Sequence, residues 1–309
     1  MDGILVALKP PGPTSHDIVA LVRRLAATKR VGHGGTLDPF ASGVLPLFLG
    51  RATRVVEYHL GDRKGYRATV CFGAASTTDD LEGELTPADA PAPAPEAVEA
   101  ALDQLRGPIS QRPPAYSAIK VAGRRAYAMA RAGESVELAS RDVTIHRLDL
   151  VEWNPADADR PIAILEVECS AGTYIRALAR DLGGLVGGGA YLGALSRTSS
   201  GPFRLEQAIP LERVREAAAE GPDALASLLL PIDAGLESLP ELVLNDGEVT
   251  AISRGQFIRA ALPPSEPDAP IRVRDGAGRL VAIATVRDGR LAPDKVLVDA
   301  LPATRATDG

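Results

Sequence analysis

The segment Gly32-His33-Gly34-Gly35-Thr36-Leu37-Asp38-Pro39-Phe40-Ala41-Ser42-Gly43 places a single carboxylate at the end of a glycine-rich loop. Glycine lets a backbone approach a large ligand closely, and the proline after Asp38 fixes the turn beside the acid. Aspartate followed by proline is also a common turn dipeptide. The loop by itself therefore leaves two interpretations of Asp38 open, a functional carboxylate and an ordinary turn residue.

A second candidate segment, Cys169-Ser170-Ala171-Gly172-Thr173-Tyr174-Ile175-Arg176, has the pattern of a strand that turns into a helix with an arginine in its first turn. Such an arginine is either solvated or aimed inward at a buried carboxylate. If Arg176 met Asp38, the ion pair would keep that carboxylate ionised and fix its rotamer. The sequence does not decide whether the two side chains meet.

Composition places the chain among soluble globular proteins. Its 309 residues are enough for one large and one smaller domain, and 45% hydrophobic with 24% charged residues is an ordinary balance. No apolar run approaches the roughly 18 residues of a spanning helix, and residues 1–6 lack the basic flank of a signal peptide. We therefore expect a cytoplasmic protein with no membrane partner.

The sequence lacks the common cofactor and metal motifs. It contains no phosphate-binding Gly-Lys-Ser/Thr, no Gly-x-Gly-x-x-Gly between a strand and a helix, and no Gly-x-Ser-x-Gly. The four histidines form no His-x-x-x-His pair, and Cys71 and Cys169 sit in apolar strand-like runs without neighbouring ligands. We expect both cysteines to be core residues and the chemistry to need no metal and no cofactor.

Basic residues are confined to particular segments, although the net charge is −6. Residues 1–67 hold ten basic and five acidic side chains, and residues 106–131 hold six basic and no acidic ones. The intervening stretch 79–103 holds eight acids and no base. This distribution is typical of a protein that grips a polyanion on one face, but chance clustering on a solvated surface is the alternative.

Periodicity predicts a mixture of strands and helices. Ser15 is the expected cap of the first helix, and residues 87–95 form a proline-rich exposed spacer. We expect strands or apolar strand-like runs at 3–8, 43–49, 66–72, 143–153 and 162–169, and helices near 15–25, 52–58, 97–105, 126–132 and 174–185. Two acidic helical stretches follow Phe203.

The last part of the chain has the pattern of a small β domain beginning at about residue 238. Short alternating runs at 271–273, 280–286 and 295–298 are separated by Asp275-Gly276 and Asp288-Gly289. Aspartate followed by glycine between alternating runs is a strong hairpin signal.

Six segments, taken together and in order, strongly resemble the TruB family, the bacterial tRNA pseudouridine-55 synthases. They span about residues 3 to 210. The segments are Gly3-Ile4-Leu5-Val6-Ala7-Leu8-Lys9-Pro10, the glycine-rich loop from Gly32 to Gly43, Lys64-Gly65-Tyr66-Arg67-Ala68, Pro113-Pro114-Ala115-Tyr116-Ser117-Ala118-Ile119-Lys120, the stretch from Cys169 to Arg176, and Leu195-Ser196-Arg197.

The resemblance implies an α+β fold with two domains. The first, residues 1–235, would be a pseudouridine-synthase core, a mixed β-sheet flanked by helices. It would carry a basic RNA-clasping insertion at about residues 106–140. The second, residues 236–309, would be a small PUA-like RNA-binding β domain.

The resemblance also implies a reaction. A stand-alone, monomeric enzyme would isomerise uridine in the T loop of tRNA, breaking the C–N glycosidic bond and forming a C–C bond at C5. Asp38 matches the catalytic aspartate, which either attacks C1′ or removes a 2′ proton. Arg176 matches its arginine partner, and Tyr66 matches the tyrosine that stacks on the base and assists proton removal from C5.

Further residues carry expected roles by the same resemblance. Tyr174 and Leu195 match pocket positions, His33 matches a ring that packs where bases are extruded, and Lys9 matches a basic residue of the first motif. The resemblance also implies that the acidic stretch 79–103 faces away from the RNA. We expect the phosphate contacts to be made by basic side chains, namely Lys64, Lys120, Arg124, Arg125 and Arg131.

Two rival functions remain open. A guide-RNA-dependent synthase of the dyskerin type shares the aspartate loop and a PUA domain but lacks the basic insertion. A non-catalytic chaperone that refolds tRNA would need the basic surface but not Asp38.

Overall fold

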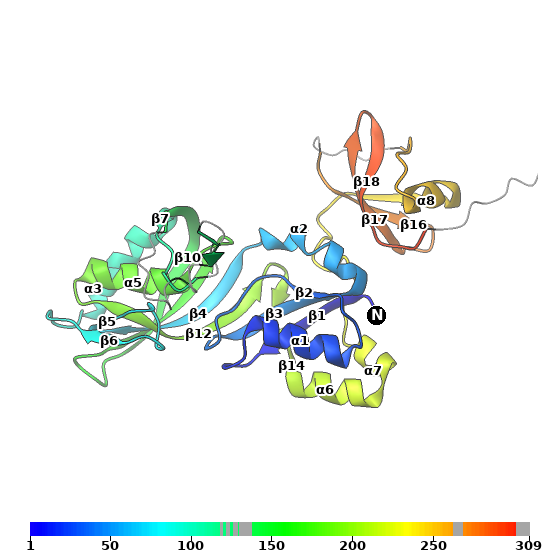
Figure 1. Cartoon of the computed structure of the whole chain (residues 1–309). Coiled ribbons are helices and arrows are strands. Elements are labelled where there is room, and N and C mark those ends of the chain that lie inside the picture. The colour runs from blue at the N-terminus through cyan, green and yellow to red at the C-terminus, as the bar shows by residue number, and fades with distance from the viewer. Residues whose placement is uncertain (118–119, 122–123, 126–128, 130–137, 262–267, 301–309) are drawn as a thin grey trace, which may run out of the picture.

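The computed structural model describes residues 1–117, 120–121, 124–125, 129, 138–261 and 268–300. The predicted α+β class is confirmed: a ten-stranded mixed sheet carries helices, and a separate four-stranded sheet follows near the C-terminus (Figure 1). No helix in these described ranges is long and apolar enough to cross a membrane.

The strands of the large sheet follow the order β14-β1-β3-β12-β4-β11-β10-β7, with β2 beside β3 and β13 beside β12. Most neighbours are antiparallel, but β12 runs parallel to β3 and β14 runs parallel to β1. The bounds are β1 Gly3–Lys9, β2 Val31–His33, β3 Ser42–Leu49, β4 Lys64–Phe72, β7 Gly107–Gln111, β10 Arg141–Asn154, β11 Ile162–Cys169, β12 Ala190–Ser200, β13 Phe203–Arg204 and β14 Ile209–Pro210.

Helices and short 3-10 turns connect these strands. The α-helices are α1 Ser15–Leu25, α2 Glu57–Leu60, α3 Pro95–Leu102, α5 Ile175–Val186, α6 Leu211–Glu220, α7 Pro222–Ala226 and α8 Asp246–Ser253. The 3-10 turns are η1 Gly50–Arg54, η2 Asp103–Leu105 and η3 Leu205–Gln207. The predicted helix near residues 126–132 lies outside the described residues except for Met129.

The cap of α1 differs from the prediction. Thr14, not Ser15, is the N-cap, because its hydroxyl accepts the backbone N–H of Asp17 while the Asp17 carboxylate accepts that of Thr14. Ser15 is buried and bonds to Leu37 instead, accepting its N–H at 2.8 Å and donating to its carbonyl at 3.1 Å. Ser15 therefore ties the residue just before Asp38 to the first helix.

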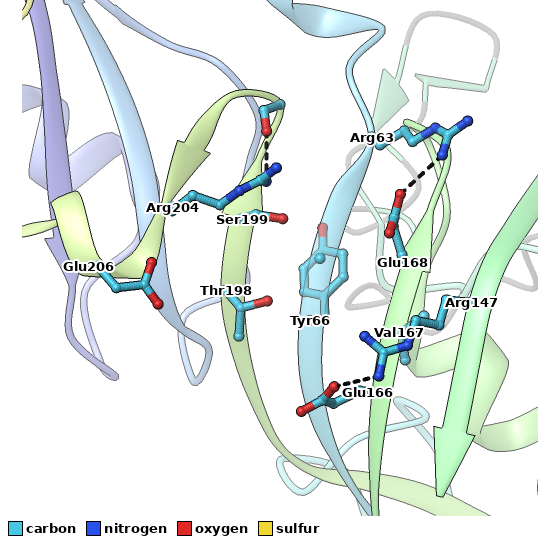
Figure 2. A pocket seen from close by; sticks show the side chains of 12 residues that line it. Arg63, Tyr66, Arg147, Glu166, Val167, Glu168, Thr198, Ser199, Arg204 and Glu206 are labelled. Carbon is cyan, nitrogen blue, oxygen red and sulfur yellow. Dashed lines mark hydrogen bonds and ion pairs between the residues drawn. The ribbon is translucent and has the colours of Figure 1, made fainter. Parts of the chain in front are cut away.

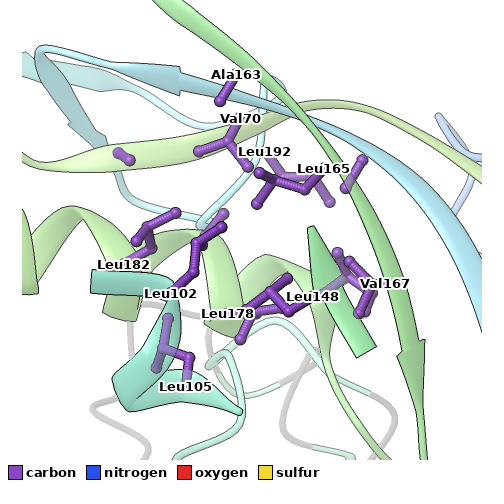
Figure 3. Close-up of a cluster of buried hydrophobic side chains, with 14 of the residues drawn as sticks. Val70, Leu102, Leu105, Leu148, Ala163, Leu165, Val167, Leu178, Leu182 and Leu192 are labelled. Carbon is purple, nitrogen blue, oxygen red and sulfur yellow. The ribbon is translucent and has the colours of Figure 1, made fainter. Parts of the chain in front are cut away.

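The core beside the proposed site lies between the sheet and the helices α3 and α5 (Figure 3). Val70 of β4 and Leu165 of β11 face Leu102 of α3 together with Leu178 and Leu182 of α5. Each such side chain contributes about 1.5–3 kcal/mol when it is fully buried. Because successive side chains of a strand point to opposite faces, this packing also fixes which residues of β4 face the helices.

The central strand β12 is an element that the sequence did not predict. It pairs with both β3 and β4, and register shifts interrupt it between Leu192 and Ala194 and between Arg197 and Ser199. Gly193 lies at the first shift, and a Cβ there would approach Cys71 Sγ to 2.6 Å. These irregularities break the strict alternation by which strands are recognised.

The smaller sheet has the order β15-β16-β17-β18. Its strands are β15 Glu241–Leu244, β16 Ile271–Asp275, β17 Leu280–Arg287 and β18 Arg290–Val296. The predicted hairpins are present, with Asp288 at a φ of 51° in the second turn. The helix α8 was not predicted; Asn245 and Glu248 form its capping box.

The small sheet packs against the large one. Leu280 and Ile283 of β17 belong to the same buried cluster as Ile4 of β1 and Phe48 of β3. Lys295 pairs with Glu57 at 2.8 Å across the contact. The two sheets therefore share a hydrophobic seam near α2 (Figure 1).

Two short ribbons complete the described structure. One joins β5 Ala74–Ser76 to β6 Leu85–Pro87, and the other joins β8 Lys120–Val121 to β9 Arg124–Arg125.

Candidate active site

The loop between β2 and β3 presents Asp38 beside a network of buried cations. Lys9, at the end of β1, is fully buried and its ammonium donates to the carbonyls of Pro39 at 2.9 Å, Ala41 at 2.6 Å and Pro10 at 3.0 Å. Burial lowers the pKa of Lys9 to about 8, with Asp38 opposing the shift. Lys9 thus supports the backbone that directly follows Asp38 without reaching the surface.

Asp38 and Arg176 are brought together, although they are far apart in the sequence. Arg176, buried in the first turn of α5, places Nε 3.0 Å from Asp38 Oδ2 and donates from Nη2 to Oδ1 at 3.2 Å. The Asp38 side chain keeps 33% of its surface exposed. One side of the carboxylate is therefore held by the arginine while another side is open to a substrate.

Arg176 also contacts a second carboxylate, which the sequence did not single out. Its Nη1 lies 3.2 Å from Asp80 Oδ2 and donates to the Thr78 carbonyl, while Nη2 donates to the Tyr116 carbonyl at 2.9 Å. Asp80 is buried, although it belongs to the acidic stretch that we expected to face away from RNA. The adjacent acids Asp79 and Asp80 were the only feature of the sequence that could have indicated a role for Asp80. They did not stand out, because the stretch 79–103 contains several other acidic residues.

The electrostatic environment of Asp38 differs from what an ion pair alone would produce. Burial raises the pKa of the Asp38 carboxyl, Asp80 adds to the rise, and Arg176 and Lys9 oppose it. The net direction is upward, so desolvation outweighs the arginine. A carboxylate with a raised pKa is more basic and less hydrated, and both properties favour attack on carbon or removal of a proton.

Tyr66 lies on β4, half-buried, directly across from Arg197 of β12. Burial raises the pKa of the Tyr66 hydroxyl, Arg197 opposes the rise, and Cys169 and Asp38 add to it. Arg197 also donates to the carbonyls of Gly35 and Thr36, so it connects Tyr66 with the loop that carries Asp38.

The other expected pocket residues lie around this centre. The backbone of Tyr174, the residue before α5, exchanges two hydrogen bonds with the Gln111 side chain, and the Arg141 guanidinium lies 5.5 Å from its ring centre. Leu195 is buried in β12 within the core cluster. His33 ends β2, accepts the Gly35 N–H at 3.3 Å, and has its pKa lowered by burial and by Arg197 and His16.

The expected phosphate contacts fall into different environments. Lys64 is buried, donates to the His59 carbonyl at 3.4 Å, and has its pKa lowered to about 8 by burial. Its ammonium is enclosed in this structure, and a phosphate contact of Lys64 stays a prediction. Lys120 is the backbone partner of Arg125 in the β8–β9 ribbon, which also carries Arg124. Arg131 lies outside the described residues.

A hollow of about 530 Å³ is lined by residues of β4, β11 and β12 (Figure 2). Tyr66 and its neighbour Gly65 both belong to this lining. The charged side chains there already pair, Arg63 with Glu168 and Arg147 with Glu166, each at 3.1 Å. Asp38 is not among the residues that line the hollow, so we place the reacting carboxylate outside it.

Among the described residues, no group of three histidine, cysteine or acidic side chains could hold a metal ion. Cys169 is buried and burial raises its pKa to about 11, while Cys71 is half-buried with a raised pKa. Both thiols are therefore poor nucleophiles, as core residues would be.

Three protein-family models match consecutive parts of the chain. Residues 23–175 match the N-terminal domain of TruB family pseudouridylate synthases, residues 176–237 match the C-terminal domain of tRNA pseudouridylate synthase B, and residues 240–297 match the C-terminal part of pseudouridine synthase II TruB. The chain belongs to the TruB family. This membership makes it a pseudouridine synthase, an enzyme of the isomerase class.

Full-length relatives agree with the TruB assignment. The chain is 44% identical to tRNA pseudouridine synthase B of Bradyrhizobium diazoefficiens over 300 residues, which cover 95% of this chain and 85% of that protein. It is also 44% identical to tRNA pseudouridine synthase B of Pseudomonas aeruginosa over 303 residues, 96% of each chain.

Solved structures share the TruB fold. A chain of an H/ACA RNP bound to a substrate RNA containing 2′-deoxyuridine matches with a TM-score of 0.72 at 24% identity, covering 96% of this chain and 86% of that one. A chain of a Cbf5-Nop10-Gar1 complex matches with a TM-score of 0.70 at 25% identity, covering 96% and 85%. At this level of identity the likeness concerns the fold.

Proposed function

We propose that the chain isomerises uridine to pseudouridine at position 55 in the T loop of tRNA, without a guide RNA. The observation that carries this proposal is the Asp38 carboxylate, held by buried Arg176 and open on one side. The 44% identity to proteins called tRNA pseudouridine synthase B supports tRNA as the substrate.

In the proposed reaction the target nucleotide leaves its stack and enters the space beside Asp38. The Asp38 carboxylate either attacks C1′ or removes a 2′ proton, and the C–N bond to the base breaks. The base then turns, C5 bonds to C1′, and C5 loses its proton. Arg176 orients Asp38 throughout, and Tyr66 stacks on the base and assists the removal of the C5 proton.

RNA recognition is proposed to involve three parts of the chain. His33 would pack against the loop from which bases are extruded, and Tyr174 and Leu195 would line the pocket. The β8–β9 ribbon of the 106–140 insertion would contact phosphates, and a PUA-like domain from residue 236 would add affinity. We expect the enzyme to act as a monomer in the cytoplasm, with no obligatory protein partner.

The direct test is a guide-free reaction. Purified protein is incubated with an unmodified tRNA transcript, and pseudouridine is mapped along the product. We expect it at position 55, and none when that uridine is replaced by cytidine. An unmodified T loop after prolonged incubation would overturn the proposed function and favour a guide-dependent enzyme or a tRNA chaperone.

A further inference from the structure

Arg197 of β12 is a large buried cation for which the proposed reaction has no role. Its side chain is only 1% exposed. Nε donates to the Val44 carbonyl at 2.7 Å, Nη1 to the Thr36 carbonyl at 3.3 Å, and Nη2 to the Gly35 carbonyl at 3.1 Å. Two of these carbonyls belong to the loop that leads directly to Asp38.

Carbonyls satisfy some of the hydrogen bonds of Arg197 but do not neutralise its charge. Within the part of the chain that the structure describes, no carboxylate forms an ion pair with it. Its charge also lowers the pKa of three neighbouring basic groups, Lys9, His33 and Lys64. An uncompensated buried charge is costly, and an anion that forms beside Arg197 would offset that cost.

Tyr66 is the group placed to supply that anion. Tyr66 and Arg197 are direct cross-strand partners on β4 and β12, so their side chains leave the sheet on the same face about 5 Å apart at Cβ. A guanidinium has five N–H donors, and the three carbonyls account for three of them. The hydroxyl of Tyr66 interacts with Arg197, which opposes the rise of the Tyr66 pKa that burial causes.

We propose that Arg197 is a positioning residue that stabilises the phenolate of Tyr66, and that this phenolate accepts the C5 proton. The inference rests on the proposed function and deepens it. The C5–H bond breaks and its electron pair forms the C5=C6 bond. The N1=C6 π pair moves to N1, which takes a proton from water, and the Tyr66 phenol returns its new proton to the resulting hydroxide.

The charged groups around Tyr66 also indicate when the phenolate forms. Asp38 and Cys169 disfavour it, while Arg197 favours it. When the C5–C1′ bond forms, Asp38 leaves C1′ or returns the 2′ proton, so it is a carboxylate again when the C5 proton leaves. Arg197 is therefore needed at that step to offset the negative charge of Asp38 at the Tyr66 oxygen.

The test compares Arg197→Gln, which removes the charge, with Arg197→Lys, which keeps it. Single-turnover rates are measured across pH on tRNA transcripts carrying hydrogen or deuterium at C5 of uridine. We expect Arg197→Gln to slow the reaction about tenfold at neutral pH, the change that one pKa unit would give, with recovery at alkaline pH and a new primary isotope effect. Arg197→Lys should be intermediate, and Arg215→Gln, at an exposed arginine of α6, should match the wild type.

A purely structural role predicts a different result. In that case Arg197→Gln and Arg197→Lys would lower the rate by the same factor at every pH, without an isotope effect, and the proposal would be overturned. Thermal melting shows whether the variants fold. If the variants do not fold, the wild-type enzyme provides the test. Its isotope effect for deuterium at C5 must grow as the pH falls, and an isotope effect that does not change with pH refutes the proposal. Inactive wild-type protein would instead refute the proposed function.

Discussion

Two clusters of arginine and carboxylate residues in this molecule are chemically alike and structurally different. In the first, Arg176 holds Asp38 and Asp80 at the loop after β2. In the second, Arg272 and Arg274 of β16 hold Asp233, with Arg272 Nη1 3.4 Å from Asp233 Oδ2.

The decisive difference is the exposure of the carboxylate. Asp38 keeps 33% of its side-chain surface accessible, whereas Asp233 keeps 8%. Glu241 also contacts both arginines of the second cluster, at 3.3 and 2.9 Å. Asp233 is therefore enclosed as a structural ion pair, while Asp38 is held on one side and left accessible on the other. Pairing with arginine alone does not identify a functional aspartate.

Asp38→Asn should produce the largest effect and test the open cluster directly. Loss of the reacting carboxylate should lower single-turnover isomerisation by roughly 10⁴-fold, as for other nucleophile removals. The melting temperature should stay close to that of the wild type, and tRNA affinity should stay within a few-fold of it. Asp89→Asn, at an exposed aspartate of the spacer, is the matched control. Wild-type turnover by Asp38→Asn would remove the distinction between the two clusters.

Asp233→Asn tests the enclosed cluster. Breaking a buried ion pair from one side leaves uncompensated charge, so the free energy of unfolding should fall by about 3 kcal/mol. Isomerisation per folded molecule should not change, because Asp233 contacts no residue of the Asp38 site. Denaturant unfolding and active-site-normalised rates measure the two quantities, with Asp288→Asn in the exposed β17–β18 turn as control. A catalytic defect with intact stability would reverse the roles assigned here.

Asp80→Asn tests the support behind Arg176. A small displacement of Arg176 should lower kcat by about 10²-fold. Asp80 also raises the pKa of Asp38, so its loss should lower that pKa. Because the reaction needs the Asp38 carboxylate, the acidic limb of the rate profile should move to lower pH. Asp79→Asn, which instead disrupts the 2.8 Å pair with Arg180, should leave the limb in place. If the acidic limb of the Asp80→Asn rate profile did not move, Asp80 would not influence the ionisation of Asp38.

The smallest expected effect concerns the basic ribbon, which belongs to neither cluster. Replacing Arg124 and Arg125 together by glutamine should weaken tRNA binding and lower the salt dependence of log Kd by about 1–2. Isomerisation at saturating tRNA should be unchanged. Binding titrations at several salt concentrations measure the slope. An unchanged slope would show that these arginines do not meet phosphates.

Local patterns in the sequence predicted much of the architecture. The strands around Gly3–Lys9, Lys64–Phe72 and Ile162–Cys169 and the C-terminal hairpins follow from apolar alternation and from turns rich in aspartate and glycine. The strand β12 escaped notice because its bulges interrupt that alternation. Thr14 and Asp17 form a capping box, and the sequence alone placed the cap one residue too late.

The sequence by itself determined the family, the candidate aspartate and the residues expected near it, because these depend on the order of residue types along the chain. Only the tertiary structure decided which charges meet. It brought Arg176 to Asp38 and Asp80, placed Arg197 across from Tyr66, and buried Lys64. Contacts between distant segments depend on strand register and on desolvation, and both arise only when the sheet and its helices pack together.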